Sequence, residues 1–326
     1  MKTEILKMLR EANTYLSGQE LSEQLGVSRT AVWKVIRQLG EEGYEIEAVR
    51  NKGYRLVKSA DVLSKEEIES CLKTQWAGRN LIYYPVTDST NTRIQQMAEE
   101  GAVHGSVAVA GEQTAGKGRR GRSWIDPPGA GIAMSILLRP EISSENASML
   151  TLVAALAATK AIRTLTGLDA KIKWPNDVVL SGKKAVGILT QMSTEEDAIR
   201  YVIVGIGVNV NREHFPEEIE QTATSLKLES GRTISRSSLV AEILQEFETY
   251  YARFLEKNDL SELCAEYDSW SANVGRVVRV LDPAGEYSGE ALGIDSRGQL
   301  LVKCAPGEIR RVISGEVSVR GIYGYV

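Results

Sequence analysis

The feature that most constrains this 326-residue chain is a tight corner between two amphipathic segments near its N-terminus. Ser17 and Glu20 form a Ser-x-x-Glu capping box, which predicts a helix that ends at Gly26. Ser28 can cap the next helix almost at once, and its apolar residues recur at helical spacing: Val32, Val35, Ile36 and Leu39. Two helices joined by so short a turn are typical of a helix-turn-helix.

Basic side chains accompany this corner, although the whole chain has a net charge of −4. Two short alternating runs, 45–49 and 54–57, flank a basic tip and predict a hairpin like the wing of a winged helix. A DNA contact would use this local face, since the chain as a whole is not basic. The alternative is a three-helix unit whose exposed cations have no DNA partner. The expected DNA-binding residues are Arg29, Thr30, Lys34, Arg37 and Lys52.

Beyond a predicted linker at 59–61, the pattern changes twice. Residues 64–271 mix apolar strands with longer helical patterns, and residues 272–326 contain short strands separated by turns at 282–285, 295–298 and 305–308. The sequence therefore predicts an α+β chain of three domains, 1–60, 64–271 and 272–326, the last a small SH3-sized β-barrel. The predicted strands are 81–86, 106–112, 131–138, 170–173, 178–180, 185–192 and 201–210, and the helices are 91–100, 145–165 and 236–255.

The cysteines and apolar runs exclude several classes. Cys71, Cys264 and Cys304 are odd in number and lack CxxC spacing, so neither a disulfide framework nor a zinc cluster is expected, and a reducing cytoplasm fits. The most apolar stretch, 149–158, is far shorter than the roughly 20 residues that span a bilayer. His104 and His214 have no neighbours at metal-ligand spacing, so any metal should arrive with a phosphate ligand.

A glycine-rich basic segment, Gly116-Lys-Gly-Arg-Arg-Gly, matches GxGxxG in letters only. Two prolines and a glycine follow at 127–129, which excludes the helix that a dinucleotide fingerprint requires, and no Gly-Lys-Ser/Thr ends it as in a Walker loop. Its glycines let backbone N–H groups approach a ligand, and its cations favour a phosphate or carboxylate. The alternative is a mobile surface loop. The cations are Lys117, Arg119, Arg120 and Arg122.

Further candidates lie between apolar strands. In Trp174-Pro-Asn-Asp177, Trp174 and Pro175 could build an apolar wall, and the oxygens of Asn176 and Asp177 could hold magnesium on a nucleotide, although Pro-Asn-Asp is also a common turn. Lys184 could supply a charge to an anion or simply point into solvent. Gly205 and Gly207 interrupt a buried strand, which indicates that something approaches its backbone closely. Residues 88–91 predict a helix N-cap.

Four motifs in this order, 88–91, 113–122, 173–177 with Lys184, and 205–209, resemble those of the biotin protein ligases. With the N-terminal winged helix, the whole chain resembles the bifunctional bacterial form, which is also a repressor of biotin synthesis genes. The resemblance implies a central mixed sheet with helices, similar to class II synthetases, and an SH3-like C-terminal β-barrel.

The resemblance also implies the chemistry. Biotin and Mg-ATP give biotinyl-5′-AMP, and the biotinyl group passes to a lysine of a biotin carboxyl carrier domain of acetyl-CoA carboxylase or a related carboxylase. The adenylate is the corepressor, and the adenylate-bound homodimer binds operator DNA. By this likeness, biotin is bound by Ser89, Thr90, Asn91, Gln113, Gly116, Lys117, Gly118, Arg119 and Lys184, of which Arg119 and Lys184 are catalytic. ATP or adenylate is bound by Arg122, Trp124, Asp177 and Asn209, with Mg²⁺ on Asp177.

One residue departs from the family pattern. The glycine loop commonly has arginine where Lys117 stands, and lysine keeps the charge but lacks the planar fork of a bidentate contact. The chemistry otherwise agrees, because biotin's carboxylate is already ionised near neutral pH and needs no Ser-His or Cys-His pair. Two other functions stay open on the residues alone: a DNA-binding sensor that holds an anionic metabolite without reacting it, and a lipoate ligase.

Overall fold

The computed structural model describes residues 1–12, 14–58, 61–125, 127–196, 198–282, 285–304, 307–313, 318–321 and 325–326. The chain forms two compact units: Met1–Lys73 with Ser235–Ala241, and Thr74–Ile234 with Glu242–Val326. Residues 59 and 60 of the predicted linker lie outside the described residues, as do 283, 284, 305 and 306 of the predicted turns. The three domain ranges stay a prediction.

The first unit contains the predicted helix-turn-helix. The Ser17–Glu20 capping box is formed, with Ser17 Oγ accepting from Glu20 N at 3.1 Å and Glu20 Oε2 accepting from Ser17 N at 2.7 Å. Gly26 ends the second helix with a left-handed φ of 64°, and Ser28 caps the third through its 3.2 Å hydrogen bond from Ala31 N. The helices are α1 (Lys2–Glu11), α2 (Gly18–Leu25) and α3 (Arg29–Glu41), whose apolar faces meet in one buried core.

The predicted wing is also present. Strand β1 (Glu45–Val49) pairs antiparallel with β2 (Gly53–Lys58). Gly53 has a φ of 112°, and a Cβ there would lie 2.6 Å from Ser17 Cα, so only glycine fits where the hairpin returns beside the start of α2.

A further helix, α4 (Lys65–Cys71), belongs to the same unit and packs on α1. Its Glu67 side chain is 1% exposed and forms an ion pair with Arg10 of α1. A buried carboxylate needs such a partner, because burial of an unpaired charge costs several kcal/mol. The pair therefore ties α4 to the winged helix, which makes α4 part of the first unit rather than a free connector.

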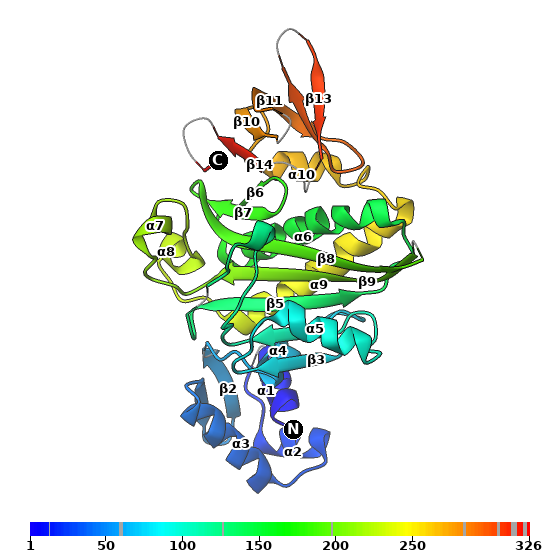
Figure 1. Ribbon diagram of the computed structural model, residues 1–326. Helices are drawn as coiled ribbons and strands as arrows, with labels where there is room; N and C mark the ends of the chain where they lie inside the picture. Colours follow the sequence, from blue (N-terminus) through cyan, green and yellow to red (C-terminus); the bar gives the residue numbers. More distant parts are fainter. Residues whose placement is uncertain are drawn as a thin grey trace. The chain divides into compact units, whose positions relative to one another are not determined.

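A seven-stranded mixed sheet forms the centre of the second unit, in the order β3-β4-β5-β9-β8-β7-β6 (Figure 1). Strands β3 and β4 are parallel, and every other neighbouring pair is antiparallel. All predicted strands are present, with ends that shift by a few residues. The strands are β3 (Leu81–Tyr84), β4 (Val107–Ala110), β5 (Gly131–Leu138), β6 (Lys171–Lys173), β7 (Asp177–Leu180), β8 (Lys183–Glu195) and β9 (Ala198–Asn209).

Helices cover both faces of this sheet. Gln191 of β8 contacts Asn91 of α5 (Thr90–Glu99), whereas its neighbour Thr190 contacts Thr151 of α6 (Leu150–Thr166). Because successive strand residues point to opposite faces, α5 and α6 lie on opposite sides, and Figure 1 shows α9 (Arg236–Lys257) on the side of α6. The remaining elements are the 3₁₀ helices η1 (Arg119–Gly121) and η2 (Ser144–Met149), and α7 (Glu217–Glu220), α8 (Leu226–Ser230) and α10 (Cys264–Trp270).

The predicted helix 145–165 is thus a short 3₁₀ helix followed by α6. By length and composition alone, the segment Ser144–Thr166 could cross a membrane, but 72% of its apolar window is buried inside the protein. This burial is that of a core helix packed against the sheet.

The C-terminal part is a five-stranded antiparallel sheet in the order β13-β12-β11-β10-β14. Trp174, which follows β6 and is 1% exposed, donates its indole N–H to Gly298 O of this part at 3.0 Å. Its backbone N–H also donates to Asn273 Oδ1 at 2.8 Å. The predicted α+β class is confirmed. The strands are β10 (Val277–Leu281), β11 (Tyr287–Ile294), β12 (Leu300–Lys303), β13 (Ile309–Val312) and β14 (Ser318–Gly321).

Candidate functional site

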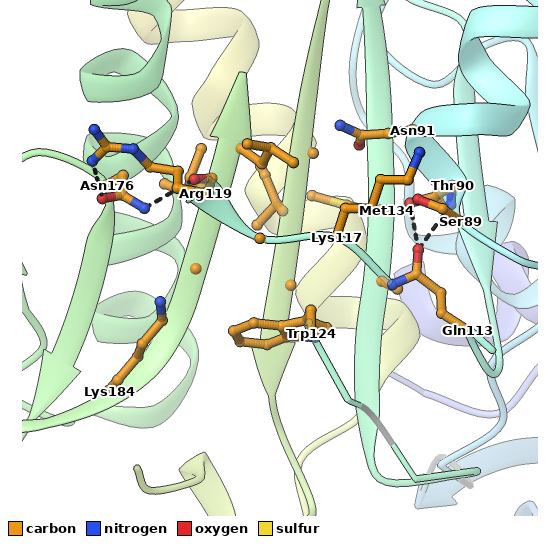
Figure 2. Close-up of a pocket in the computed structure, with 18 residues that line it drawn as sticks. Ser89, Thr90, Asn91, Gln113, Lys117, Arg119, Trp124, Met134, Asn176 and Lys184 are labelled. Carbon is orange, nitrogen blue, oxygen red and sulfur yellow. Dashed lines mark hydrogen bonds between the residues drawn. The ribbon is translucent and has the colours of Figure 1, made fainter. Parts of the chain in front are cut away.

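A pocket with an empty volume of about 440 Å³ lies on the α5 side of the central sheet (Figure 2). It is built by the start of α5, the end of β4, the loop before β5, the turn between β6 and β7, and strands β8 and β9. Polar side chains at α5 and a cation pair near β8 lie at its two sides. The predicted residues that line it are Ser89, Thr90, Asn91, Gln113, Lys117, Gly118, Arg119, Trp124 and Lys184.

The polar side is organised by Gln113, just after β4. Its Oε1 accepts from Thr90 N at 2.8 Å and from Thr90 Oγ1 at 3.1 Å. Ser89 is the N-cap of α5, but its side chain makes no capping hydrogen bond. Gln113 instead satisfies the backbone N–H of Thr90, one of the donors that the first turn of a helix leaves without an intrahelical partner. Ser89 and Gln113 both line the pocket.

Two residues that the sequence did not single out complete this side. Ser135 of β5 is fully buried, and its hydroxyl donates to Asn91 Oδ1 at 2.6 Å. The same hydroxyl oxygen lies within hydrogen-bond distance of Thr90 Oγ1, at 2.7 Å. Asn91 Nδ2 donates to Gln191 Oε1 at 2.7 Å. A serine inside the apolar run 131–138 was the only sequence signal for this network. It fixes the direction in which Asn91 presents its amide.

Contacts within the pocket explain why the buried strand β9 contains glycine at positions 205 and 207. A Cβ on Gly205 would lie 3.0 Å from Asn91 Cγ and closer still to its Oδ1, and a Cβ on Gly207 would lie 2.7 Å from Trp124 Nε1. A Cβ on Gly187 would lie 2.8 Å from Trp124 Cζ3. The prediction that something approaches this backbone closely is confirmed: the approaching groups are an amide and an indole ring.

The glycine-rich loop has an irregular conformation, as the two prolines that follow it at 127 and 128 predict. Gly118 N donates to Arg122 O at 2.7 Å, and Trp124 N donates to Gly116 O at 2.9 Å, so the loop folds back on itself. Arg120 has a φ of 55° within the single 3₁₀ turn η1. Gly116 does not line the pocket but lies beneath Trp124, because a Cβ there would overlap Trp124 O.

The cationic side combines Arg119 with Lys184. Arg119 Nη1 donates to Asn176 Oδ1 at 2.8 Å, and burial lowers the pKa of its guanidinium. Figure 2 shows Arg119 and Lys184 on the same side of the pocket, with Lys117 on the other side near Ser89 and Thr90. Two fixed cations on one side of a pocket suit an anionic phosphate or carboxylate.

Lys184 is held by a buried carboxylate. Its Nζ lies 2.6 Å from Asp177 Oδ1, and its charge lies 5.6 Å from the Trp124 ring. Burial acts to raise the pKa of Asp177, but the positive charges of Lys184 and Lys173 outweigh it, so the pKa is lowered and the carboxylate stays ionised.

Asp177 itself faces an adjoining pocket, which contains Arg119, Trp124 and Lys184 too, together with Arg122, Trp174 and Pro175. Its Oδ2 accepts a hydrogen bond from Tyr325. Its Oδ1 is engaged by Lys184, and the described His, Cys, Asp and Glu residues form no cluster of three or more that could hold a metal without further ligands. Asn209 is buried at the end of β9 and lines neither pocket.

The expected DNA-binding residues lie in the first unit. Arg29, Thr30, Lys34 and Arg37 are all exposed on α3, opposite its buried face, and Lys52 is exposed at the tip of the wing. Arg37 forms a helical ion pair with Glu41 at 3.0 Å. The recognition helix also exposes Trp33, beneath the Arg37 guanidinium.

Three family models match this chain in order. An HTH domain matches residues 2–55, the biotin/lipoate A/B protein ligase family matches 83–209, and the biotin protein ligase C-terminal domain matches 274–320. The class defined by the fold and the site is therefore a biotin protein ligase that carries a DNA-binding domain.

Comparison over the full length identifies the family within this class. The chain is 41% identical over 322 residues to the bifunctional ligase/repressor BirA of Bacillus subtilis, with 98% of both chains covered. It is 30% identical to the Escherichia coli protein of the same name, covering 93% of this chain and 92% of that one. The chain belongs to the family of bifunctional biotin ligase/repressors.

A solved structure agrees with most of this fold. The biotin protein ligase from Aquifex aeolicus in complex with biotin and ATP superposes with a TM-score of 0.67 at 34% identity, covering 74% of this chain and 99% of that chain.

Proposed function

We propose that this protein activates biotin with ATP and transfers it to a lysine of a biotin carboxyl carrier domain. The observation that carries the proposal is one pocket in which amide and hydroxyl groups, with Lys117 beside them, lie at one side, and the two held cations Arg119 and Lys184 lie at the other. A ureido ring needs neutral donors and acceptors, whereas an acyl phosphate needs positive charge.

In the first step, a carboxylate oxygen of biotin attacks the α-phosphorus of ATP, and the bond to the pyrophosphate leaving group breaks. Arg119 and Lys184 stabilise the negative charge that grows around phosphorus. No general base is required, because the nucleophile carries no proton at neutral pH. In the second step, an uncharged lysine amine of the carrier attacks the acyl carbon, AMP leaves, and the amine loses its proton.

The remaining assignments follow the two sides of the pocket. We assign the biotin head to the polar residues and Trp124 to the adenine; Arg122 and Asn209 are assigned to the nucleotide from the family resemblance. Magnesium arrives as part of the substrate MgATP, whose phosphate oxygens supply most of its ligands, with Asp177 as the carboxylate that the family resemblance implies. The pocket residues that we assign to biotin are Ser89, Thr90, Asn91, Gln113, Lys117, Gly118, Arg119 and Lys184, whereas Gly116, which does not line the pocket, is assigned only from the family resemblance.

A labelling experiment tests the ligase. The purified protein is incubated with biotin, α-labelled ATP and a carrier domain, with a Lys→Arg carrier as control. Biotin-dependent pyrophosphate release, formation of α-labelled biotinyl-AMP and biotinylation of only the carrier that keeps its lysine are expected. Arg119→Ala should release the adenylate faster, and Lys184→Ala should slow its formation, whereas Arg279→Ala, an exposed arginine of β10, should do neither. Absence of both the labelled adenylate and the biotinylated carrier refutes the proposal.

The same assay separates biotin from lipoate, which the matching family model also covers. An excess of lipoate should leave biotin adenylation unchanged. Adenylation of lipoate instead of biotin would make this a lipoate ligase.

We further propose that the protein represses biotin synthesis genes in the cytoplasm as an adenylate-bound homodimer. Support comes from the exposed basic face of α3 and the basic wing. Binding to a duplex selected from random DNA in the presence of biotinyl-AMP should require the adenylate, and sedimentation should show a dimer. Lys34→Ala should lower the slope of log affinity against log salt by about 1, whereas Lys7→Ala, on α1, should not. An adenylate-independent or salt-independent affinity contradicts the regulatory role.

A further inference from the structure

The second-last residue of the chain, Tyr325, lies in the pocket that adjoins the proposed adenylation site. It lines this pocket together with Lys173, Asp177 and Lys184. Tyr325 is 148 positions from Asp177 in the chain, yet its hydroxyl donates a hydrogen bond to Asp177 Oδ2. The end of the C-terminal part therefore reaches the cations of the central sheet.

Tyr325 makes a second contact through its ring. The Lys173 ammonium lies 4.0 Å from the ring centroid, which is within the range of a cation–π interaction. The hydroxyl and the ring thus engage two different charged residues of the same strand turn. A side chain held by both contacts has little freedom to rotate, and it fixes the carboxylate that it touches.

The position of that carboxylate decides where the Lys184 charge lies. Asp177 Oδ1 is 2.6 Å from Lys184 Nζ, and Oδ2 is the oxygen that Tyr325 engages. Without the hydroxyl, Oδ2 would be a buried acceptor without this donor, and the carboxylate could rotate to share both oxygens with Lys184. A lysine that is bound more closely by Asp177 would present less positive charge to a substrate anion.

We propose that Tyr325 is a positioning residue for adenylation: it fixes Asp177 and thereby holds the Lys184 ammonium where the new acyl phosphate forms. The inference rests on the proposed ligase function. It assigns the end of the C-terminal part a role in the first half-reaction, through the hydrogen bond of Tyr325 to Asp177.

The test compares Tyr325→Phe with the wild-type chain in biotin-dependent exchange of pyrophosphate into ATP. Phenylalanine keeps the ring over Lys173 and removes only the hydroxyl. Since a hydrogen bond to a charged group contributes more than a neutral one, we expect kcat to fall about tenfold, with KM for ATP and for biotin unchanged. Tyr287→Phe, which removes a hydroxyl from β11 of the same C-terminal part, should behave as wild type. Matching thermal melts check that all three proteins are folded.

The outcomes separate this inference from the ligase proposal. An inactive wild-type protein refutes the ligase function itself. An active wild type with an equally active Tyr325→Phe variant overturns only the positioning role. A higher KM for ATP at unchanged kcat would mean that Tyr325 contacts the nucleotide directly, and an equal loss in Tyr287→Phe would mean a general effect on the C-terminal part; both also overturn it.

Discussion

Lys184 has two roles in this structure, and a pair of substitutions can separate them. Its ammonium neutralises the buried carboxylate of Asp177 at 2.6 Å, and in the proposed reaction it also faces the acyl phosphate. Lys184→Met removes both roles. The double variant Asp177→Asn with Lys184→Met also removes the carboxylate charge that Lys184 neutralises. Only the contact between the ammonium and the acyl phosphate is then missing.

The magnitude follows from the burial of the pair. The Asp177 side chain is 10% exposed, so removal of its partner leaves an almost fully buried charge, and such losses are about 3–5 kcal/mol. Because Tyr325 still donates to the carboxylate and the positive charge of Lys173 also acts on it, we expect Lys184→Met to lower the free energy of unfolding by about 3 kcal/mol. The double variant should recover to within about 1 kcal/mol of wild type, since a neutral amide is far less costly to bury.

Urea unfolding followed by fluorescence measures the free energy of unfolding, and biotin-dependent pyrophosphate exchange measures the rate of adenylation. Both variants should lose adenylation by about 100-fold or more, because a charge that stabilises the transition state is missing in each. Equal instability of the single and double variants would refute the ion-pair reasoning. Recovery of activity in the double variant would show that Lys184 serves Asp177 and not the substrate.

Three further predictions test separate parts of the structure. Gly205→Ala should weaken biotin binding at least tenfold in calorimetry, because its Cβ would overlap the Asn91 amide; an unchanged affinity would contradict that close approach. Arg10→Met should lower the free energy of unfolding by about 3 kcal/mol, and adding Glu67→Gln should restore most of that loss. Equal free energies of unfolding for wild type and Arg10→Met would show that the buried pair contributes nothing. Burial lowers the pKa of His104 from its ordinary 6.5, so the unfolded chain takes up the proton first as pH falls. The free energy of unfolding should therefore decrease as pH drops below about 6.5, and His104→Gln should lack this decrease. The same pH profile in wild type and variant would refute this reasoning.

Local interactions explain which parts of the fold the sequence could predict. The Ser17–Glu20 capping box, the left-handed Gly26 and the cap at Ser28 each depend on groups within a few residues, so the helix-turn-helix follows from short-range patterns. The irregular loop around Gly118 was equally predictable, because the prolines after it cannot continue a helix.

The sequence also indicated which segments form the candidate site, but not which of their residues contact one another. Gly205 and Gly207 indicated a close approach to a buried strand, without showing that Asn91 and Trp124 make it. Ser135 looked like one polar residue in an apolar strand, although it joins two pocket residues by hydrogen bonds.

The sequence by itself determined the strands of the central sheet, the corner of the winged helix and the cationic loop, because these depend on neighbours along the chain. Only the tertiary structure decided which charges meet: Arg10 with Glu67, Lys184 with Asp177, and Asp177 with the hydroxyl of Tyr325. Pairing between distant residues is set by sheet order and packing, which bring together side chains that no local pattern connects.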